Sequence, residues 1–206
     1  FTSGRTGNGP IGLNGVKMNV YWSAYSSEDS STPFIKYYDP VRMFDLCNNT
    51  KFEKTSNDYR LCPAFQDYAK NTFALRFPFD YELSFNDQGV TSSQYDQTFF
   101  DESFQIRSII NRLYTLNSFY LFKTEKPVMM ECFGSFFIDN DFNRKCMLIP
   151  GRFDISKWFR ILECAFTLKE GMSSLKINRG DVYAFVRFNT DEPITMKKFY
   201  MTDKIR

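Results

Sequence analysis

Histidine is absent from this chain of 206 residues. Without an imidazole there can be no Ser-His-Asp or Cys-His nucleophile pair, no histidine general base near neutral pH, and no histidine-ligated zinc or iron site. These designs account for many familiar enzymes. Because no other complete catalytic motif is present either, we predict that the protein is not an enzyme, and we expect no catalytic residue, metal ion or cofactor.

Long apolar runs, paired cysteine motifs and an excess of one charge are also missing. No segment approaches the roughly 18 apolar residues that a membrane-spanning helix needs, and no basic, apolar leader is visible. The formal net charge is only +2, with both signs interspersed, whereas a phosphate-binding surface normally needs a basic stripe. We therefore predict that neither a membrane nor a nucleic acid is a partner.

Five cysteines are present, and none forms a C-x-x-C pair. They are Cys47, Cys62, Cys132, Cys146 and Cys164. An odd number with these spacings is not a closed disulfide framework, so we expect reduced and mostly buried thiols. Such use of cysteine is typical of a chain that folds in a reducing cytosol, although a particle assembled there can later leave the cell.

Glycine is scarce outside the first fifteen residues, which hold Gly4, Gly7, Gly9, Gly12 and Gly15. This stretch lacks the Lys followed by Ser or Thr that a P-loop requires. Its low apolar content cannot offset the entropy of ordering. Residues 1–15 are therefore predicted to be an arm that is either flexible or held by a partner surface.

The remainder, residues 16–206, is predicted to be a single β-rich globular domain. Short, aromatic strand patterns occur throughout, and the last of them, from Arg160 to Tyr200, suggest a run of hairpins. Helix signals are confined to Asp39 to Cys47, with Asp39 as N-cap and Pro40 at the first helical position, to Pro63 to Asn71, and to one turn at Asp154 to Phe159. The pattern favours a β-sandwich or jelly roll with two or three short helices. The strands are expected at 16–22, 34–38, 72–77, 79–85, 104–110, 118–123, 128–133, 145–149, 160–168, 175–177, 182–188 and 194–200.

Aromatic residues are abundant, with 24 Phe, 12 Tyr and 2 Trp. Two facing sheets about 10 Å apart need large side chains between them, so core packing explains most of the phenylalanines. The excess beyond what one sandwich buries is expected at the surface, where aromatic area usually marks an interface. Tyr37-Tyr38 and Phe99-Phe100 are candidates, because adjacent strand residues point to opposite faces.

Acidic residues offer weaker candidates for chemistry. Carboxylates for carbohydrate hydrolysis could be drawn from Asp80, Glu82, Asp101, Glu102, Glu131 or Glu163. Residues 139–143 alternate oxygen side chains as a calcium loop does, but they lack its central Gly and its bidentate Glu, so a solvated turn is expected. The tripeptide Arg179-Gly180-Asp181 lies between two strand patterns and is better explained as a hairpin turn than as an adhesion motif.

Several segments together resemble an uncharacterised protein family of large tailed phages of the cyanophage type. The resemblance spans roughly residues 16–200 and implies no assigned activity, so it supplies no site residue. The segments that carry it are Cys62-Pro63-Ala64-Phe65, Lys70-Asn71-Thr72-Phe73, Pro78-Phe79-Asp80-Tyr81, Pro150-Gly151-Arg152-Phe153-Asp154-Ile155, Trp158-Phe159-Arg160, Arg179-Gly180-Asp181 with Tyr183, and Val186-Arg187-Phe188-Asn189.

Three functions remain open from the sequence. The first is a structural or decoration protein of a phage virion, part of an oligomeric assembly, that contacts other virion proteins or copies of itself. The second is a soluble phage-encoded protein that binds a host partner or small ligand in the host cytoplasm, and the third is a carbohydrate-binding or carboxylate-dependent carbohydrate-processing β-sandwich. The interaction candidates are Gly4, Gly7, Gly9, Gly12, Tyr37, Tyr38, Phe99, Phe100, Trp158 and Arg160.

Overall fold

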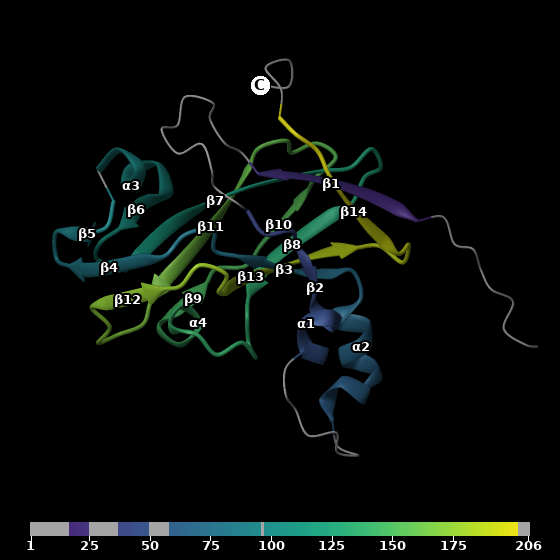
Figure 1. The fold of residues 1–206 in the computed structure, drawn as a ribbon, viewed down its shortest axis with the longest axis horizontal. Helices are drawn as coiled ribbons and strands as arrows, with labels where there is room; N and C mark the ends of the chain where they lie inside the picture. The colour runs from purple at the N-terminus through teal and green to yellow at the C-terminus, as the bar shows by residue number, and fades with distance from the viewer. Residues whose placement is uncertain (1–16, 25–36, 50–57, 96, 202–206) are drawn as a thin grey trace, which may run out of the picture.

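Two β-sheets pack against each other and a third, smaller sheet continues the structure at one end (Figure 1). The computed structural model describes residues 17–24, 37–49, 58–95 and 97–201. The fold is mainly β, consistent with the expected sandwich, with 48% of the described residues in strands and 16% in helices. Four short α-helices are present within the described residues, rather than two or three.

The six-stranded sheet contains both the first and the last described strands. Along its main path the order is β14 (Ile194–Lys198), β1 (Met18–Ala24), β7 (Leu113–Lys123), β11 (Ile161–Leu168) and β9 (Cys146–Leu148), and β6 (Phe104–Ser108) also pairs with β7. β1 and β14 run parallel, with Met18 opposite Ile194, whereas the other pairs of this sheet are antiparallel.

The other two sheets are antiparallel. The five-stranded sheet has the order β10 (Gly151–Asp154), β8 (Met129–Gly134), β13 (Val182–Asn189), β3 (Thr72–Arg76) and β2 (Val41–Arg42). The three-stranded sheet has the order β12 (Ser174–Ile177), β4 (Tyr81–Asn86) and β5 (Gly89–Ser92).

Alternation along the strands places the apolar side chains between the sheets. In β11, Leu162, Cys164, Phe166 and Leu168 are buried while Glu163 is exposed, as the pattern predicts. Fully buried aromatic rings fill much of the interior, and many meet edge to face, a favourable arrangement for ring quadrupoles. The core role expected for most phenylalanines is therefore confirmed for the described part of the chain.

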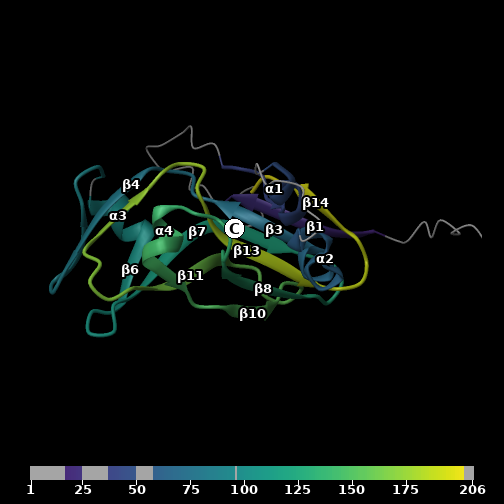
Figure 2. The ribbon, with the colours of Figure 1, turned by 90° about the horizontal axis from the view of Figure 1, so that it is seen from below.

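The helices cover parts of the sheets that would otherwise be exposed. A second apolar cluster forms between the outer face of the five-stranded sheet and two helices, α1 (Met43–Asn49) and α2 (Pro63–Ala69) (Figures 1 and 2). A short 3-10 turn at Tyr59–Leu61 precedes α2. α3 (Gln97–Ser103) precedes β6, and α4 (Asp141–Lys145) precedes β9. Pro63 at the first helical position of α2 confirms that helix prediction.

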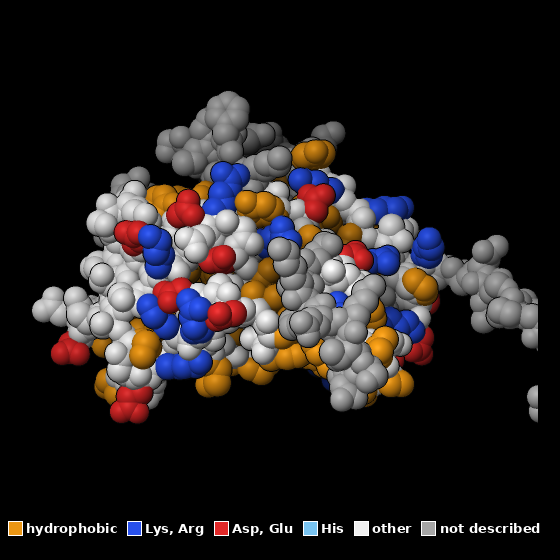
Figure 3. Space-filling view, turned by 60° about the horizontal axis from the view of Figure 1, so that its bottom comes forward, with side chains coloured by type: hydrophobic (Ala, Val, Ile, Leu, Met, Phe, Trp, Pro, Cys, Tyr) orange, Lys and Arg blue, Asp and Glu red, His pale blue; other side chains and the backbone are white. Residues whose placement is uncertain are grey.

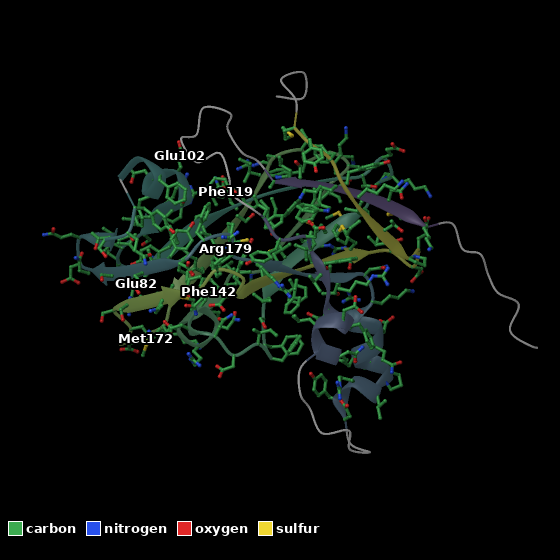
Figure 4. All side chains as sticks on the ribbon, in the orientation of Figure 1. Glu82, Glu102, Phe119, Phe142, Met172 and Arg179 are labelled. Atoms are coloured by element: carbon green, nitrogen blue, oxygen red, sulfur yellow. The ribbon has the colours of Figure 1, made fainter. Side chains whose placement is uncertain are left out.

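Phe142 on α4 closes one region of the core. Its side chain is 1% exposed. Its ring centroid lies 5.3 Å from those of Phe77 and Phe166 and 6.5 Å from that of Tyr183 (Figure 4). Phe166 belongs to the six-stranded sheet, Tyr183 belongs to the five-stranded sheet, and Phe77 directly follows β3. Asn140 fixes the start of α4, because its side-chain oxygen accepts from the Asn143 amide at 2.9 Å.

The connections between the last strands differ from the prediction. Instead of hairpins, the chain changes sheet at each step, from β11 in the six-stranded sheet to β12, then to β13, and back to the six-stranded sheet at β14. The turns lie where expected, but turn residues do not specify whether the next strand pairs with the previous one or crosses to another sheet.

Asn71 holds the crossing between β13 and β14. It adopts a left-handed backbone conformation with φ +56°. Its side-chain nitrogen donates to the carbonyl oxygens of Thr190 and Glu192 at 2.9 and 3.0 Å, and its oxygen accepts from the Ile194 amide at 3.0 Å. One side chain therefore satisfies three backbone groups of a loop more than a hundred residues away.

Three local predictions near the ends of elements are wrong. The helix expected from Asp39 begins at Met43, because Val41 and Arg42 pair with β3 as a short strand. Tyr37 and Tyr38 are not in a strand, and the remainder of the strand expected there lies outside the described residues. Residues 155–157 form a turn rather than a helix.

Candidate interaction surface

The predicted interaction residues fall into three groups. Gly4, Gly7, Gly9 and Gly12 lie outside the described residues. Tyr37, Tyr38, Phe99 and Phe100 pack mainly inward. Trp158 and Arg160 lie at the surface and contact each other. The structure therefore brings together only the last two of these candidates within the described chain.

The expectation that Phe99 and Phe100 occupy adjacent positions of a strand is wrong. Phe99 and Phe100 lie on α3, where successive side chains are not on opposite sides of a strand. Phe100 is buried and stacks on Phe104, while Phe99 is half-buried and packs edge to face on Phe79 at 5.0 Å. These two aromatic side chains are therefore packed into the core rather than exposed.

Tyr37 and Tyr38 are also part of the packed structure. Tyr37 is 7% exposed and its ring meets that of Tyr120 at 5.9 Å, and burial raises its pKa strongly. Tyr38 is half-buried, and the guanidinium groups of Arg76 and Arg179 lie 5.7 and 6.0 Å from its ring centroid. Both tyrosines thus support the fold rather than present free rings.

The Arg179-Gly180-Asp181 turn requires a glycine at its centre. The Gly180 φ of +92° disfavours other residues, and a Cβ there would approach the Tyr38 hydroxyl to 3.3 Å (Figure 4 labels Arg179). The Asp181 carboxylate accepts from the Asn178 amide at 2.9 Å, so it closes the turn. The interpretation of this tripeptide as turn chemistry agrees with the structure.

Trp158 is the centre of the exposed aromatic surface. It is 45% exposed, the Arg160 guanidinium lies 4.8 Å from its ring centroid, and the Phe153 ring lies at 5.9 Å. A guanidinium at this distance over an indole is attracted by the ring's negative face. The indole therefore has a defined orientation although much of it is in solvent.

A network of charges holds Arg160 in place. The Glu163 carboxylate accepts from Arg160 at 3.1 Å and from Arg107 at 3.0 Å, one nitrogen to each oxygen. Arg107 in turn donates to the Thr115 hydroxyl at 2.9 Å. Because these groups are exposed, their effect on stability is small, but together they restrict the rotamers beside Trp158.

Phe159, the next residue in the sequence, belongs to a second exposed aromatic contact. It is 39% exposed, its ring lies 6.3 Å from that of Phe199, and the Lys123 ammonium lies 5.6 Å from its centroid. We call Phe153, Trp158, Phe159 and Phe199, with Lys123 and Arg160, the aromatic strip. Its two central residues, Trp158 and Phe159, lie in the segment that connects β10 in one sheet to β11 in the other.

The turn before Trp158 is fixed by its own hydrogen bonds. The Asp154 carboxylate accepts from the Ser156 amide at 3.0 Å and from its hydroxyl at 2.7 Å, which lowers the pKa of Asp154. The Trp158 amide donates to the Asp154 carbonyl at 3.0 Å, and the Ile155 side chain is buried. The strip is therefore presented by an anchored segment, with little entropy to lose on binding.

Sequence reasoning missed Phe153, Phe199 and Lys123 as members of this surface. Phe153 and Trp158 are close enough in sequence for a contact to be foreseen. Phe199 and Lys123 are not, because they reach Phe159 only through the pairing of β14 with β1 and of β7 with β11. No sequence pattern reports that pairing.

Glu131 and Glu163, two of the six carboxylates considered for hydrolysis, belong to different sheets and lie on faces turned away from the shared core. Glu131 accepts from Asn189 at 2.9 Å and has Arg152 at 3.5 Å, while Glu163 is paired as described. Two carboxylates on opposite outer faces cannot flank one glycosidic bond, which requires a separation of about 5–10 Å.

Two of the other acidic candidates also lie on different elements. Glu82 lies on β4 and Glu102 on α3, both exposed, and Figure 4 shows them on separate elements. Glu82 pairs with Lys176 at 3.1 Å. In Figure 3, acidic and basic side chains alternate over the visible face, with no extended area of one sign.

Residues 139–143, expected as a solvated turn, instead enter α4, and Asp141 lies in the first turn of this helix. Burial opposes its charge, but hydrogen bonds from the Lys145 ammonium at 2.9 Å and the Lys176 amide at 2.8 Å outweigh this effect and lower its pKa. Within the described residues, no group of three or more acidic or cysteine side chains could hold a metal ion.

Surface hollows offer little enclosure. One of 570 Å³ is lined by residues that include Phe85 on β4 and Ile110, Arg112 and Met172 in neighbouring turns. The Arg112 guanidinium there donates to the carbonyl oxygens of Lys169 and Met172, so it holds the loop. No helix among the described residues has the length and apolar character needed to cross a membrane.

The chain matches no known protein family, no curated protein and no solved structure.

Proposed function

We propose that this protein is a structural or decoration component of a tailed-phage virion and that it acts by protein–protein contact. The observation that carries the contact is the aromatic strip, in which Trp158 and Phe159 are 45% and 39% exposed and are held by cations and neighbouring rings. Trp and Arg are the residue types most enriched among those that dominate binding energy at interfaces. The virion setting rests on the resemblance to proteins of large tailed phages.

The composition of the strip fits a protein partner better than a small ligand. It has apolar rings at its centre and charged groups of both signs around them, the arrangement typical of an interface core with a polar rim. Small-molecule sites are normally concave and bury most of their ligand. The strip instead lies at the surface, beside a turn whose backbone is already fixed.

Quantitative mass spectrometry of purified particles tests the virion setting. We expect a fixed copy number per particle that survives gradient purification. Absence from particles would refute it, and recovery of the chain instead with a host protein in infected cells would favour the second function considered above.

A matched pair of variants tests the strip. Trp158→Ala removes its central ring, whereas Ile110→Ala removes a side chain that is 94% exposed near the opposite end of β7, roughly 30 Å away. We expect Trp158→Ala to weaken binding to particles about 30-fold or more, as for a dominant interface residue, and Ile110→Ala to leave it unchanged. Equal binding by the two folded variants would show that the strip is not the contact surface.

A further inference from the structure

Two cysteines from different sheets meet in the core. Cys132 on β8 and Cys164 on β11 have their sulfur atoms 3.8 Å apart, and the two residues are 4% and 2% exposed. β8 belongs to the five-stranded sheet and β11 to the six-stranded sheet. The contact therefore joins the two large layers of the fold.

The distance suits a covalent link. A disulfide has its sulfur atoms about 2.05 Å apart, so each sulfur needs to move by about 1 Å from the observed positions. Such a movement is within the range of a small side-chain rotation. Both sulfur atoms of this pair are buried, whereas Cys62 is exposed.

We propose that Cys132 and Cys164 form an inter-sheet disulfide when the protein meets an oxidising environment. This inference concerns a modification of the core and does not depend on the aromatic strip or on the proposed virion setting. The chain between the two cysteines, which includes β9, β10 and α4, would become a closed loop anchored to both sheets.

The chemistry is thiol–disulfide exchange with a disulfide oxidant such as oxidised glutathione. One cysteine loses its proton and attacks the oxidant, which breaks the oxidant's S–S bond and releases one glutathione thiolate. The second cysteine then loses its proton and attacks the mixed disulfide, which forms the Cys132–Cys164 bond and releases the second glutathione. Two protein thiols are oxidised and one glutathione disulfide is reduced to two thiols.

Burial makes this reaction slow in the closed structure. The pKa of Cys164 is raised by its contact with Cys132 and by burial, so little thiolate is present near neutral pH. A bulky oxidant also needs the sheets to open locally before it reaches the pair. We therefore expect oxidation over hours to days rather than seconds, faster at higher pH.

The experiment incubates the folded protein with oxidised glutathione at about pH 8.5, then denatures it in an alkylating reagent and maps the cysteines by mass spectrometry. We expect a Cys132–Cys164 cross-link and a melting temperature about 5–10 °C higher, because the link restricts the unfolded chain. Exposed Cys62 should carry glutathione, which shows that the oxidant was active.

Variants provide the control. Cys62→Ser removes the exposed thiol and should keep both the cross-link and the gain in melting temperature, whereas Cys164→Ser should lose both. The proposal is overturned if Cys62 is modified while Cys132 and Cys164 both remain free after several days, or if either of them is cross-linked to a different cysteine. The mapping of the unmodified chain decides this even if Cys164→Ser does not fold.

Discussion

Phe142 offers the sharpest test of how the core is built. We expect Phe142→Ala to reduce the free energy of unfolding by about 4 kcal/mol. Transfer of a buried Phe side chain accounts for about 1.5–3 kcal/mol of this. The cavity that remains adds to the loss, and Phe→Ala substitutions in cores cost about 3–5 kcal/mol in all.

The upper part of that range applies because the site cannot easily collapse. Phe77, Phe166 and Tyr183 surround the ring and are themselves fully buried. Their own packing prevents them from moving into the space. For a chain of this size, each kcal/mol corresponds to about 2–4 °C, so the melting temperature should fall by roughly 8–16 °C.

Urea unfolding followed by tryptophan fluorescence measures this loss, because Trp22 is 2% exposed and enters solvent on unfolding. Phe136→Ala is the matched control, since the same side chain is 63% exposed there. It should cost less than about 1 kcal/mol, mainly from ring contacts with its neighbours. Equal losses in the two variants would refute the argument that α4 closes the core through Phe142.

Three further predictions concern single side chains. Asn71→Ala should lower the free energy of unfolding by about 2–4 kcal/mol, and Asn71→Gly by about 1 kcal/mol less, because glycine tolerates the positive φ; equal losses in thermal unfolding would exclude that backbone contribution. Gly180→Ala should cost about 1–2 kcal/mol while Gly151→Ala, with open space around it, should be nearly neutral in the same assay. The pKa of Asp141 is lowered in the folded protein, so its contribution to the free energy of unfolding is complete above the unfolded pKa and is lost as the pH falls through the folded value. Between roughly pH 5 and pH 2, Asp141→Asn should therefore lose less stability than the parent protein in urea unfolding.

Periodicity predicted the strands well because burial imposes it directly. The alternating side chains of β11 and of β1 follow from one face meeting the core. The helix at Pro63 was equally predictable, since its proline occupies a position that helices favour. At Asp39 the same signals were present, but pairing of Val41 and Arg42 with β3 replaced the first helical turn.

Contacts between distant segments could not be predicted in this way. The aromatic strip needs Phe199 beside Phe159, and the thiol contact needs Cys132 opposite Cys164. Both depend on which sheet each strand joins, and the turns that separate the last strands have the same residue types whether the chain forms a hairpin or crosses over. Trp158 and Arg160 are among the predicted interaction residues, and their mutual contact joins residues that are close in the sequence.

The parallel pairing of β1 with β14 has a consequence for synthesis of the chain. A growing polypeptide exposes one edge of β1 until residues 194–198 have left the ribosome, and an unpaired edge is a template for pairing with another chain. Contacts this distant in sequence also slow folding. The interval before β14 emerges is thus when nascent chains are most exposed to mispairing, and a truncation that removes β14 would make that exposure permanent.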